Sequence, residues 1–530
     1  MSEIPESQKT TSNSYDAIPY PSLPIDAMHP DHLYSIAKLF RLDAPLPDNA
    51  SILELGCASG GHIIPIAVQM PDAKIVGVDL SRKQIAAGQR TVDALGLKNL
   101  KLIAMDFQRL DASLGQFDYI LCHGVFSWVP PEAQQCILQI CQARLSTNGV
   151  AYISYNAYPG WFARGMIRQM MLPYVSQLPD IESRLQQARA LLSFIVESTE
   201  NQNTPYSQSL KNELDLLAKN PDSYLFHEHL EENNHPMFFY QFMELATAHQ
   251  LQFLSESILA TMITSNLAPK ADTSLKKLTT SLIEQSQYMD FATNRMFRQS
   301  LLCHSAQNLE RHLNSDRLEG CRFAGRYQID DPSTANNLSN GVEIIFKNAN
   351  GRTIQTKDPV LKALLLTVTE AWPGSLTACE ICERMAKKLS EHLIVGQREL
   401  VSIENLVNSS MLHMVLRGDL AFRFLPDRFV MDISDRPIVS ALARLQATQG
   451  SMLTTQRHTV VHADPLTRMV VPVVDGRRTQ EGIAEFIGEL AGGKLSVEVQ
   501  GTGSIDWSLV QKATADKILE FLRRSAMLIG

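Results

Sequence analysis

The chain has 530 residues, 45% of them hydrophobic and 20% charged, and carries a formal net charge of −8 at pH 7. Because phosphate binding needs clustered lysine and arginine, and this acidic chain has no long basic block, the composition argues against a nucleic-acid partner. No apolar run approaches the roughly 18 residues that cross a bilayer, and the polar N-terminus is unlike a signal peptide, so we expect a cytoplasmic protein without stable membrane insertion.

The N-terminal segment divides into three parts. Residues 1–14 are rich in Ser, Thr and Gln and have no apolar period, which predicts a disordered tail. Residues 15–30 are rich in proline and aromatic residues, which predicts an extended segment. Pro30 and Asp31 then begin a predicted helix that runs to Phe40, since proline fits the first turn of a helix.

A short apolar strand from Ile52 ends in an acid, Glu54, and leads into a turn of small residues. Glycines in such a turn let the backbone approach a ligand more closely than a Cβ would allow. The next predicted strand, 74–79, ends in Asp79, where a carboxylate can accept hydrogen bonds from ribose hydroxyls. A strand, a glycine turn and a helix in this order predict a nucleotide-binding unit. The turn contains Gly56, Cys57, Ala58, Gly60 and Gly61.

The turn fits the patterns for NAD and for S-adenosylmethionine almost equally well, and three other features favour S-adenosylmethionine. Glu54 stands where NAD enzymes usually have an apolar residue. The predicted strand 100–105 ends at Asp106 and Phe107, which suit the amine and the ring of an adenine. The predicted strand 117–122 runs into a loop, 123–130, that would face the ligand. The alternative is a nucleotide-free domain of the same fold, whose acids only cap helices.

Strands and helices alternate as far as Asn156, as a parallel sheet requires. We therefore assign the nucleotide-binding core to residues 15–160. The helical patterns of 161–235 then read as an insertion, and the sheet should finish at about 236–262, within a segment 236–330 that also holds further helices. The insertion could be a lid, a substrate platform or a dimer surface, and the sequence leaves this choice open.

The character of the chain changes after an Asn/Ser-rich linker near 331–341. Asn350-Gly351 between two apolar runs predicts a hairpin. Three helical patterns and a second predicted hairpin, 412–424, follow, so residues 340–430 are expected to form a winged-helix-like module. A similar but less regular pattern begins at Asp464, Pro465 and Leu466, which predicts a related C-terminal domain at 431–530. The stretch 398–412 is nearly uncharged, which favours contact with protein over DNA.

Two sets of potential metal ligands are expected to bind no metal. Cys379 and Cys382 lie in a helical pattern without a second pair at zinc-ribbon spacing, so buried thiols are the preferred interpretation. His227 and His229 are expected on opposite faces of an acidic helix.

Taken together, these motifs resemble class I S-adenosylmethionine-dependent methyltransferases. The resemblance is closer still to the bacterial group with a methyltransferase regulatory domain, which includes the rickettsial protein lysine methyltransferases of outer-membrane proteins. It implies an α/β, Rossmann-like methyltransferase domain with a helical insertion, followed by α+β winged-helix-like domains, with S-adenosyl-L-methionine as cofactor. The likeness is stronger before about residue 310, and it rests on the segments 15–21, 29–32, 54–57, 77–81, 123–130, 154–161, 226–231 and 294–299.

The expected site follows from the ends of the predicted strands. The cofactor-binding residues are predicted to be Tyr20, Glu54, Gly56, Cys57, Ala58, Gly60, Asp79, Leu80, Asp106, Phe107, His123 and Gly124. An aromatic channel that desolvates the methyl acceptor would draw on Tyr20, Phe126, Trp128, Tyr155, Tyr158 and Trp161. His123, Trp128, Tyr155, Tyr158 and Trp161 are the candidate catalytic residues. For His123 three roles stay open: general base, substrate orienter, or hydrogen bonding to loop backbone.

The resemblance implies an enzyme that methylates lysine side chains of a protein. The alternatives are a small-molecule methyltransferase and a non-catalytic regulator that binds S-adenosylmethionine. The fourth strand ends in Cys122-His123 and lacks both the Asp/Asn-Pro-Pro motif of exocyclic base methylation and the Pro-Cys of cytosine-carbon methylation. We expect no nucleic-acid partner and leave a homodimer open. We also expect a chain that ends near residue 315 to bind S-adenosylmethionine almost normally but to lose most activity on a protein substrate.

Overall fold

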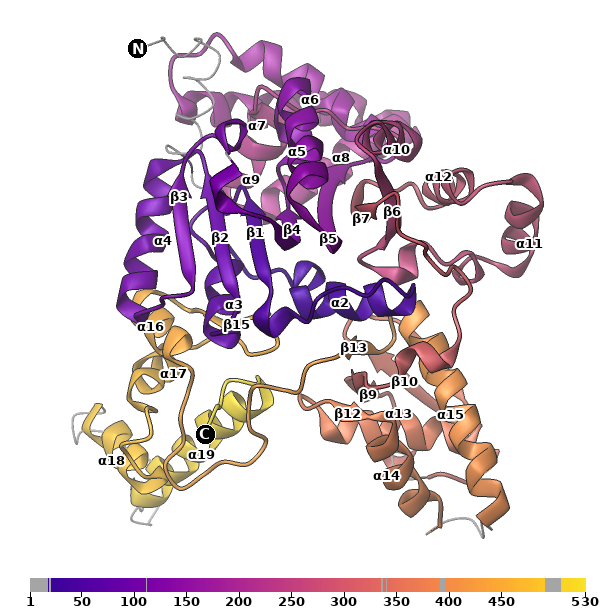
Figure 1. The fold of residues 1–530 in the computed structure, drawn as a ribbon. Coiled ribbons are helices and arrows are strands. Elements are labelled where there is room, and N and C mark those ends of the chain that lie inside the picture. The colour runs from indigo at the N-terminus through magenta and orange to yellow at the C-terminus, as the bar shows by residue number, and fades with distance from the viewer. Residues whose placement is uncertain are drawn as a thin grey trace.

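The structure is a computed structural model that describes residues 18, 21–110, 112–334, 337–339, 341–390, 397–490 and 507–530. The predicted tail 1–14 and the site candidate Tyr20 lie outside the described residues. Figure 1 shows an α/β part from which the helices of the insertion rise at one end, while the C-terminal modules, in orange and yellow, lie at the other end. Among the described residues, the structure contains no helix that is both long enough and apolar enough to span a membrane.

A seven-stranded sheet with the order β3-β2-β1-β4-β5-β7-β6 forms the centre of the α/β part. The first five strands are parallel, and β7 runs antiparallel to both β5 and β6. Parallel strands are apolar because helices cover both of their faces. The bounds are β1 Ser51–Leu55, β2 Lys74–Asp79, β3 Leu100–Ala104, β4 Phe117–Cys122, β5 Leu145–Asn156, β6 Leu251–Glu256 and β7 Phe297–His304.

Helices cover the two faces of the sheet with separate hydrophobic cores. α2, α3 and α4 pack on one face, and α5 and α10 pack on the other. The predicted helix after Pro30 is confirmed, with His29 as its N-cap. The bounds are α2 Pro30–Leu39, α3 Ile63–Gln69, α4 Arg82–Leu95, α5 Pro131–Arg144 and α10 Phe239–Ala248.

The helices predicted between residues 161 and 235 are present and have a small core of their own. They are α6 Trp161–Val175, α7 Ile181–Thr199, α8 Pro205–Lys219, α9 Asp222–Leu225 and a π-helix, η7 Phe226–Leu230.

The expected end of the sheet at about 236–262 is wrong, because the strand β7 follows much later. Two further helices, α11 Pro269–Leu278 and α12 Leu282–Thr293, project beside the sheet before the chain returns as β7 (Figure 1). β7 inserts between β5 and β6, and its residues Ser300–Cys303 are buried. A short apolar run far along the chain gave no local sign that it completes this sheet.

The first predicted hairpin of the C-terminal half is confirmed by the antiparallel pair β10 and β11. The second, 412–424, is wrong. Its first half continues the helix α15, because Met411, Met414 and Val415 are buried in the core at the i, i+3 and i+4 spacing of a helix. Gly418, at φ +73°, then ends the helix. The elements are β8 Arg322–Ala324, β9 Tyr327–Ile329, β10 Ile344–Asn348, β11 Thr353–Thr356, α13 Pro359–Ala371, β12 Leu376–Thr377, α14 Ala378–Ser390, α15 Gln397–Arg417 and β13 Ala421–Arg423.

The last module has its own hydrophobic core. It consists of α16 Ala441–Gln449, β14 Met452–Thr454, β15 Val460–His462, α17 Pro465–Val470, α18 Gln480–Leu490 and α19 Trp507–Arg524. In the preceding module, the expectation of buried thiols is wrong for Cys379, which is exposed, while Cys382 is half-buried. The buried face of α14 is formed by Ile381, Met385 and Leu389, so the helix turns Cys379 away from the core.

Candidate active site

The turn after β1 adopts the left-handed conformation that its glycines allow. Gly56 and Gly60 have φ values of +76° and +79°. A Cβ on Gly56 would collide with the side chain of Val125 in the loop after β4, so the two loops meet here without space for a side chain. Ala58 is also left-handed, at φ +48°. The left-handed conformation destabilises an alanine by about 1–2 kcal/mol, so the turn contains local strain.

Asp79 joins the glycine loop to the start of α4. Its Oδ2 accepts a hydrogen bond from the backbone N–H of Ala58, and its Oδ1 accepts one from Ser81, both at 2.8 Å. Each carboxylate oxygen can accept more than one hydrogen bond, so both can also receive hydroxyl groups of a ribose. The next residue, Leu80, is 48% exposed, which leaves an apolar side chain beside the carboxylate.

Glu54 is a buried acid at the end of β1. It is 4% exposed, and its Oε2 has no hydrogen-bond partner among the described residues. Burial, followed by the nearby Asp79, raises the pKa of Glu54 well above its usual range. Burial of a carboxyl group without an opposite charge is unfavourable, so Glu54 is suited to bind an ammonium group of a ligand. The positive charge of that group would lower the pKa of Glu54 and favour its ionised form. The glycine turn, Asp79 and Glu54 therefore fit S-adenosylmethionine.

The third and fourth strands place their candidates differently. Asp106 caps a short 3-10 helix by accepting from the N–H of Gln108 at 3.0 Å, and Phe107 is half-buried against the core behind β4. Asp106 could also accept a hydrogen bond from the amine of an adenine, but its role as a helix cap is by itself a sufficient reason for an acid at this position. Gly124 donates its N–H to Ser154 Oγ at 2.8 Å, which fixes the loop after β4 on the end of β5.

Within the described part of the chain, the hydrogen bond of His123 goes to a side chain of the sheet and not to loop backbone. Its Nδ1 lies 2.9 Å from the hydroxyl of Tyr152, and its ring contacts that of Phe297 at 5.7 Å between centroids. Burial lowers the pKa of His123 to about 4, so the ring is neutral at physiological pH. A neutral ring held in this way suits an orienting role better than that of a base near pH 7.

The structure separates the aromatic candidates into three groups. Trp128 and Trp161 form a T-shaped pair, with 6.1 Å between centroids. Tyr158 stacks on Phe162, at 4.4 Å, in an aromatic cluster that reaches the surface. Tyr155 is 1% exposed and stacks on Phe242 of α10 at 4.2 Å. Tyr155 is therefore a core residue and not part of a channel, because its position on β5 directs it to the face that α10 covers. Phe126 is likewise fully buried against Phe242.

A polar cluster that sequence reasoning missed lies where β4 and β5 end. Ser127 accepts from the N–H of Asn156 through its Oγ, at 2.8 Å, and from the N–H of His235 through its carbonyl, at 2.7 Å. Asn156 donates to Asn234 Oδ1 at 3.1 Å. Asn234 Nδ2 and His235 Nε2 have no partner among the described residues. The Asn-Asn-His-Pro run in the sequence was the available signal, but nothing local links it to the end of β5.

The N-terminal arm, residues 18 and 21–29, lies on the glycine loop. Gly61 donates its N–H to Ser22 Oγ at 2.8 Å, and a Cβ on Gly61 would collide with the carbonyl of Ser22. At the far end of the arm, His227 Nε2 bonds to the carbonyl of Ile18 at 2.7 Å. The arm therefore connects the π-helix of the insertion to the glycine loop. This role of His227 was also missed.

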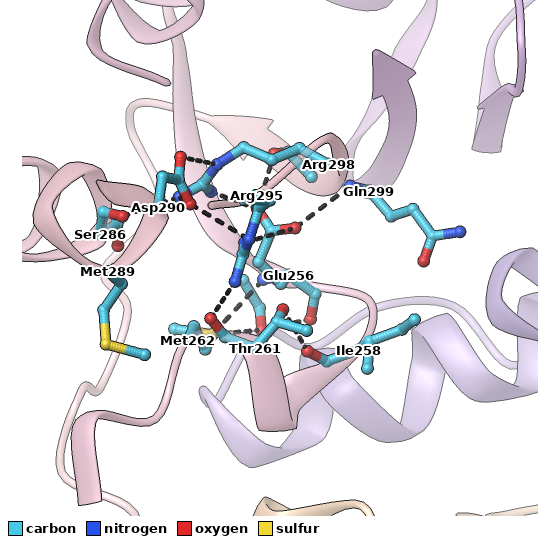
Figure 2. A network of polar contacts seen from close by, with 12 residues as sticks. Glu256, Ile258, Thr261, Met262, Ser286, Met289, Asp290, Arg295, Arg298 and Gln299 are labelled. Atoms are coloured by element: carbon cyan, nitrogen blue, oxygen red, sulfur yellow. Dashed lines mark hydrogen bonds and ion pairs between the residues drawn. The ribbon is translucent and has the colours of Figure 1, made fainter. Parts of the chain in front are cut away.

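A buried ionic network holds β7 and α12 together next to this site (Figure 2). Arg298 makes a bidentate contact with Asp290, at 2.7 and 2.9 Å, and reaches Glu256 at 2.6 Å. Arg295 contacts the same two acids. The carbonyl of Arg295 in turn accepts the N–H of Gly160 at 2.9 Å, where a Cβ would collide with the neighbouring Met296. The network thereby fixes the segment that precedes Trp161.

Three family models match the chain. A methyltransferase domain matches residues 52–149, a predicted methyltransferase regulatory domain matches 221–304, and the C-terminal winged helix domain of PKMT matches 435–527. The last match places a winged helix in the segment 431–530, which was predicted as an echo of the preceding module.

The chain is similar to rickettsial proteins over nearly its full length. An uncharacterized protein of Rickettsia prowazekii strain Madrid E is 37% identical over 495 residues, covering 92% of this chain and 88% of the relative. The solved structure of PKMT2 from Rickettsia typhi matches with a TM-score of 0.85 and 30% identity, covering 96% of this chain and 100% of that one. The complex of PKMT2 with AdoHcy matches with a TM-score of 0.84 at the same identity, covering 97% and 100%.

Proposed function

Because the chain belongs to the class I S-adenosylmethionine-dependent methyltransferases with a methyltransferase regulatory domain, the group of the rickettsial PKMT enzymes, we propose that it methylates lysine side chains of a protein. Methyl transfer from S-adenosylmethionine is the activity of the family. The observation that carries the lysine proposal is the match to PKMT2 along the whole chain, winged-helix module included. Small-molecule methyltransferases have no evident need for these additional modules.

In the proposed site, the cofactor supplies a sulfonium-bound methyl group that is open to direct displacement. Asp79 would accept the ribose hydroxyls, and Glu54 would face the ammonium group of the methionine part. Leu80 and Phe107 would contact the adenine, with Asp106 at its amine. The left-handed turn from Gly56 to Gly60 leaves room for backbone approach. Tyr20 remains a proposed contact outside the described residues.

The acceptor lysine must reach the site as a neutral amine. At pH 7.4, removal of its proton costs about 4 kcal/mol, from an ordinary pKa near 10.4 and roughly 1.36 kcal/mol per pH unit. Apolar walls lower this cost because they destabilise the ammonium form. Trp128 and Trp161, with Tyr158 towards the surface, are the proposed walls.

The polar cluster at the ends of β4 and β5 supports the same proposal. Burial, followed by Arg168, lowers the pKa of His235, so its ring is neutral and one of its nitrogens can accept a proton. The backbone N–H of His235 is held by the carbonyl of Ser127, the residue that precedes Trp128. We assign to His235 the role of hydrogen-bond acceptor for the amine, and to His123 an orienting role in the loop after β4.

A labelling experiment tests the proposal. The protein is incubated with S-adenosylmethionine that carries a radioactive methyl group and with bacterial lysate, which is then separated into protein and small-molecule fractions. We expect label in protein, released as methyllysine on complete hydrolysis. The Asp79→Ala variant serves as a blank, and Asp72→Ala, at an exposed aspartate of the same domain, is its matched control. Label in the small-molecule fraction alone would favour a small-molecule methyltransferase, and no label in either would favour a binding regulator.

A further inference from the structure

A histidine of the winged-helix module reaches the cofactor domain. His458 lies in the turn between β14 and β15, and its ring sits between those of His62 and His29, with 4.6 and 4.9 Å between centroids. His458 Nε2 and His62 Nδ1 are 2.8 Å apart. The three side chains are 1%, 3% and 6% exposed. Two histidines of the cofactor domain and one of the C-terminal module thus form a buried cluster, here called the histidine cluster.

The hydrogen bonds allow one arrangement of protons in this contact. The backbone N–H of Ile25 donates to His62 Nδ1 at 3.2 Å, so this nitrogen accepts. His458 must therefore donate from its Nε2. His458 Nδ1 and His62 Nε2 have no partner among the described residues. A further proton on His62 would enter at Nδ1 and remove the acceptor that both donors need, so the contact requires a neutral His62.

The histidine cluster lies directly behind the glycine loop. His62 follows Gly60 and Gly61 and stands at the N-terminus of α3. Its Nδ1 holds Ile25 of the arm, and the arm holds Gly61 through Ser22. A second contact from the same module, Gln69 Nε2 to the carbonyl of Gln456 at 3.3 Å, fixes the other end of α3. The turn that carries His458 is thus connected to both ends of the helix that begins at the cofactor loop.

We propose that the winged-helix module positions the cofactor-binding loop through His458, so that cofactor affinity depends on the docking of this module and falls when the histidine cluster takes up protons. His458 is a positioning residue, since it acts through His62. The inference rests on the proposed cofactor site but not on the identity of the methyl acceptor.

The charges around the histidine cluster set the direction of the pH effect. Burial is the main cause that lowers the pKa of His29, His62 and His458, and the cation of Arg423 lowers all three further. His32 on α2 shifts in the same direction, to about 4. Among the described residues, the other charged or titratable groups around the histidine cluster are Asp26, Asp31, His123, Asp427, Arg428 and Arg457. A hollow of about 60 Å³ lined by His29 and His458 gives protons a route to the histidine cluster.

The signs of these shifts do not all agree. A histidine whose pKa is lowered on docking stabilises the docked state above its free pKa of about 6.5 and loses this contribution as the pH falls below it. Burial raises the pKa of Asp31 to about 6, and protonation of Asp31 in the same range favours docking instead. Asp31 and His32 contact residues 422–425, which precede the winged-helix module, whereas His29 and His62 contact His458 of the module itself. Acid therefore acts on the docking of the module through the three histidines of the cluster and loosens it.

Calorimetric titration with S-adenosylhomocysteine at pH 7.5 and 6.0 tests the proposal on the full chain. His458→Phe keeps a ring but loses the donor, and we expect it to bind about fivefold more weakly at pH 7.5, the factor for one neutral hydrogen bond. His458→Gln keeps an N–H donor and cannot titrate. It should bind within about twofold of the wild type at pH 7.5 and lose less affinity at pH 6.0. His462→Gln, at an exposed histidine of β15, should follow the wild type at both values.

The variants distinguish a failure of the coupling through His458 from a failure of the proposed cofactor site. If Asp79→Ala binds normally, the proposed cofactor site is wrong. If Asp79→Ala binds weakly while His458→Phe keeps wild-type affinity and pH dependence, the site stands and the coupling through His458 is wrong. Should His458→Phe fail to fold, as judged by circular dichroism, the comparison of His458→Gln with the wild type decides. Identical pH dependence of those two proteins would overturn the role of the histidine cluster.

Discussion

Ala58 combines a strained backbone conformation with a hydrogen bond to Asp79 in the proposed cofactor site. The turn places this alanine at φ +48°, while its N–H is needed by Asp79. The backbone bond explains why the conformation is kept although the residue is not glycine. The backbone N–H of residue 58 donates the hydrogen bond, whereas the strain comes from the Cβ of the alanine. Replacing Ala58 by glycine can therefore relieve the strain and keep the hydrogen bond.

We therefore expect Ala58→Gly to leave the free energy of unfolding unchanged or to raise it by up to about 1.5 kcal/mol. Glycine relieves about 1–2 kcal/mol of left-handed strain, but it loses roughly 0.5–1 kcal/mol more backbone entropy on folding. Denaturant unfolding measures the difference. Ala50→Gly, at an ordinary φ of −76°, is the control and should destabilise the protein. Equal destabilisation by both substitutions would contradict the strain argument.

Asp79 provides a test of the cofactor itself. With ligand at 100 times its dissociation constant, S-adenosylmethionine or S-adenosylhomocysteine should stabilise the protein by about 2.7 kcal/mol, and NAD should not. Asp79→Ala should lose most of this ligand-induced shift, because it removes the acceptor for the ribose hydroxyls. The shift is compared with and without ligand for each protein, since Asp79 also bonds Ala58 and Ser81 in the free enzyme. A wild-type melt that NAD alone raises would reverse the assignment.

At the scale of elements, the ionic network of Figure 2 explains how a late strand and helix join the sheet. Arg298 is 1% exposed, pairs with Asp290 and Glu256, and also stacks over Phe239 of α10 at 3.7 Å. Buried charges are tolerated only when they are paired and hydrogen-bonded. The network therefore fixes one arrangement of β6, α12 and β7, and with it the segment that leads to Trp161.

Removal of one partner should be costly, because it leaves a buried cation without compensation. We expect Asp290→Asn to lower the free energy of unfolding by about 3–5 kcal/mol. Glu370→Gln breaks the more exposed pair with Lys388 and should change stability by less than about 1 kcal/mol. Urea unfolding of the three proteins gives both values. A loss of less than 1 kcal/mol for Asp290→Asn would mean that the network contributes little.

At the scale of the whole molecule, the C-terminal half is bound to the cofactor domain at several points besides the histidine cluster. Asp31 on α2 accepts from the N–H groups of Phe424 and Leu425, at 3.0 and 3.1 Å. Arg423 pairs with Asp26 of the arm, and Arg428 pairs with Asp48. These contacts argue against the expectation that a chain ending near residue 315 binds the cofactor almost normally.

Two shortened chains separate the contributions to cofactor affinity. A chain that ends at residue 433 keeps the contacts of Asp31 and loses His458, and we expect it to bind S-adenosylhomocysteine about fivefold more weakly than the full chain. A chain that ends at residue 315 loses both sets of contacts and should bind more weakly still, or fail to fold. Calorimetry and circular dichroism on the same samples decide between these results. Full affinity in the shorter chain would restore the original expectation.

The sequence by itself determined the cofactor domain, because its signals are local. Glu54, the glycine turn and Asp79 follow one another at fixed spacing, and a strand, a tight turn and a helix can be recognised within about thirty residues. The helices of the insertion and the hairpin at Asn350-Gly351 were predicted for the same reason, since periodicity and turn residues act between neighbours.

Only the tertiary structure decided which distant segments meet. In the structure, Tyr155 lies in the core and α15 continues through the predicted hairpin. The last strand of the sheet is formed by residues 297–304, and His458 lies beside His62. Each of these outcomes depends on burial against residues far along the chain, and local patterns carry no record of such a partner. Burial decides them because an apolar or neutral side chain gains its stabilisation from whatever surface covers it, whatever its separation in sequence.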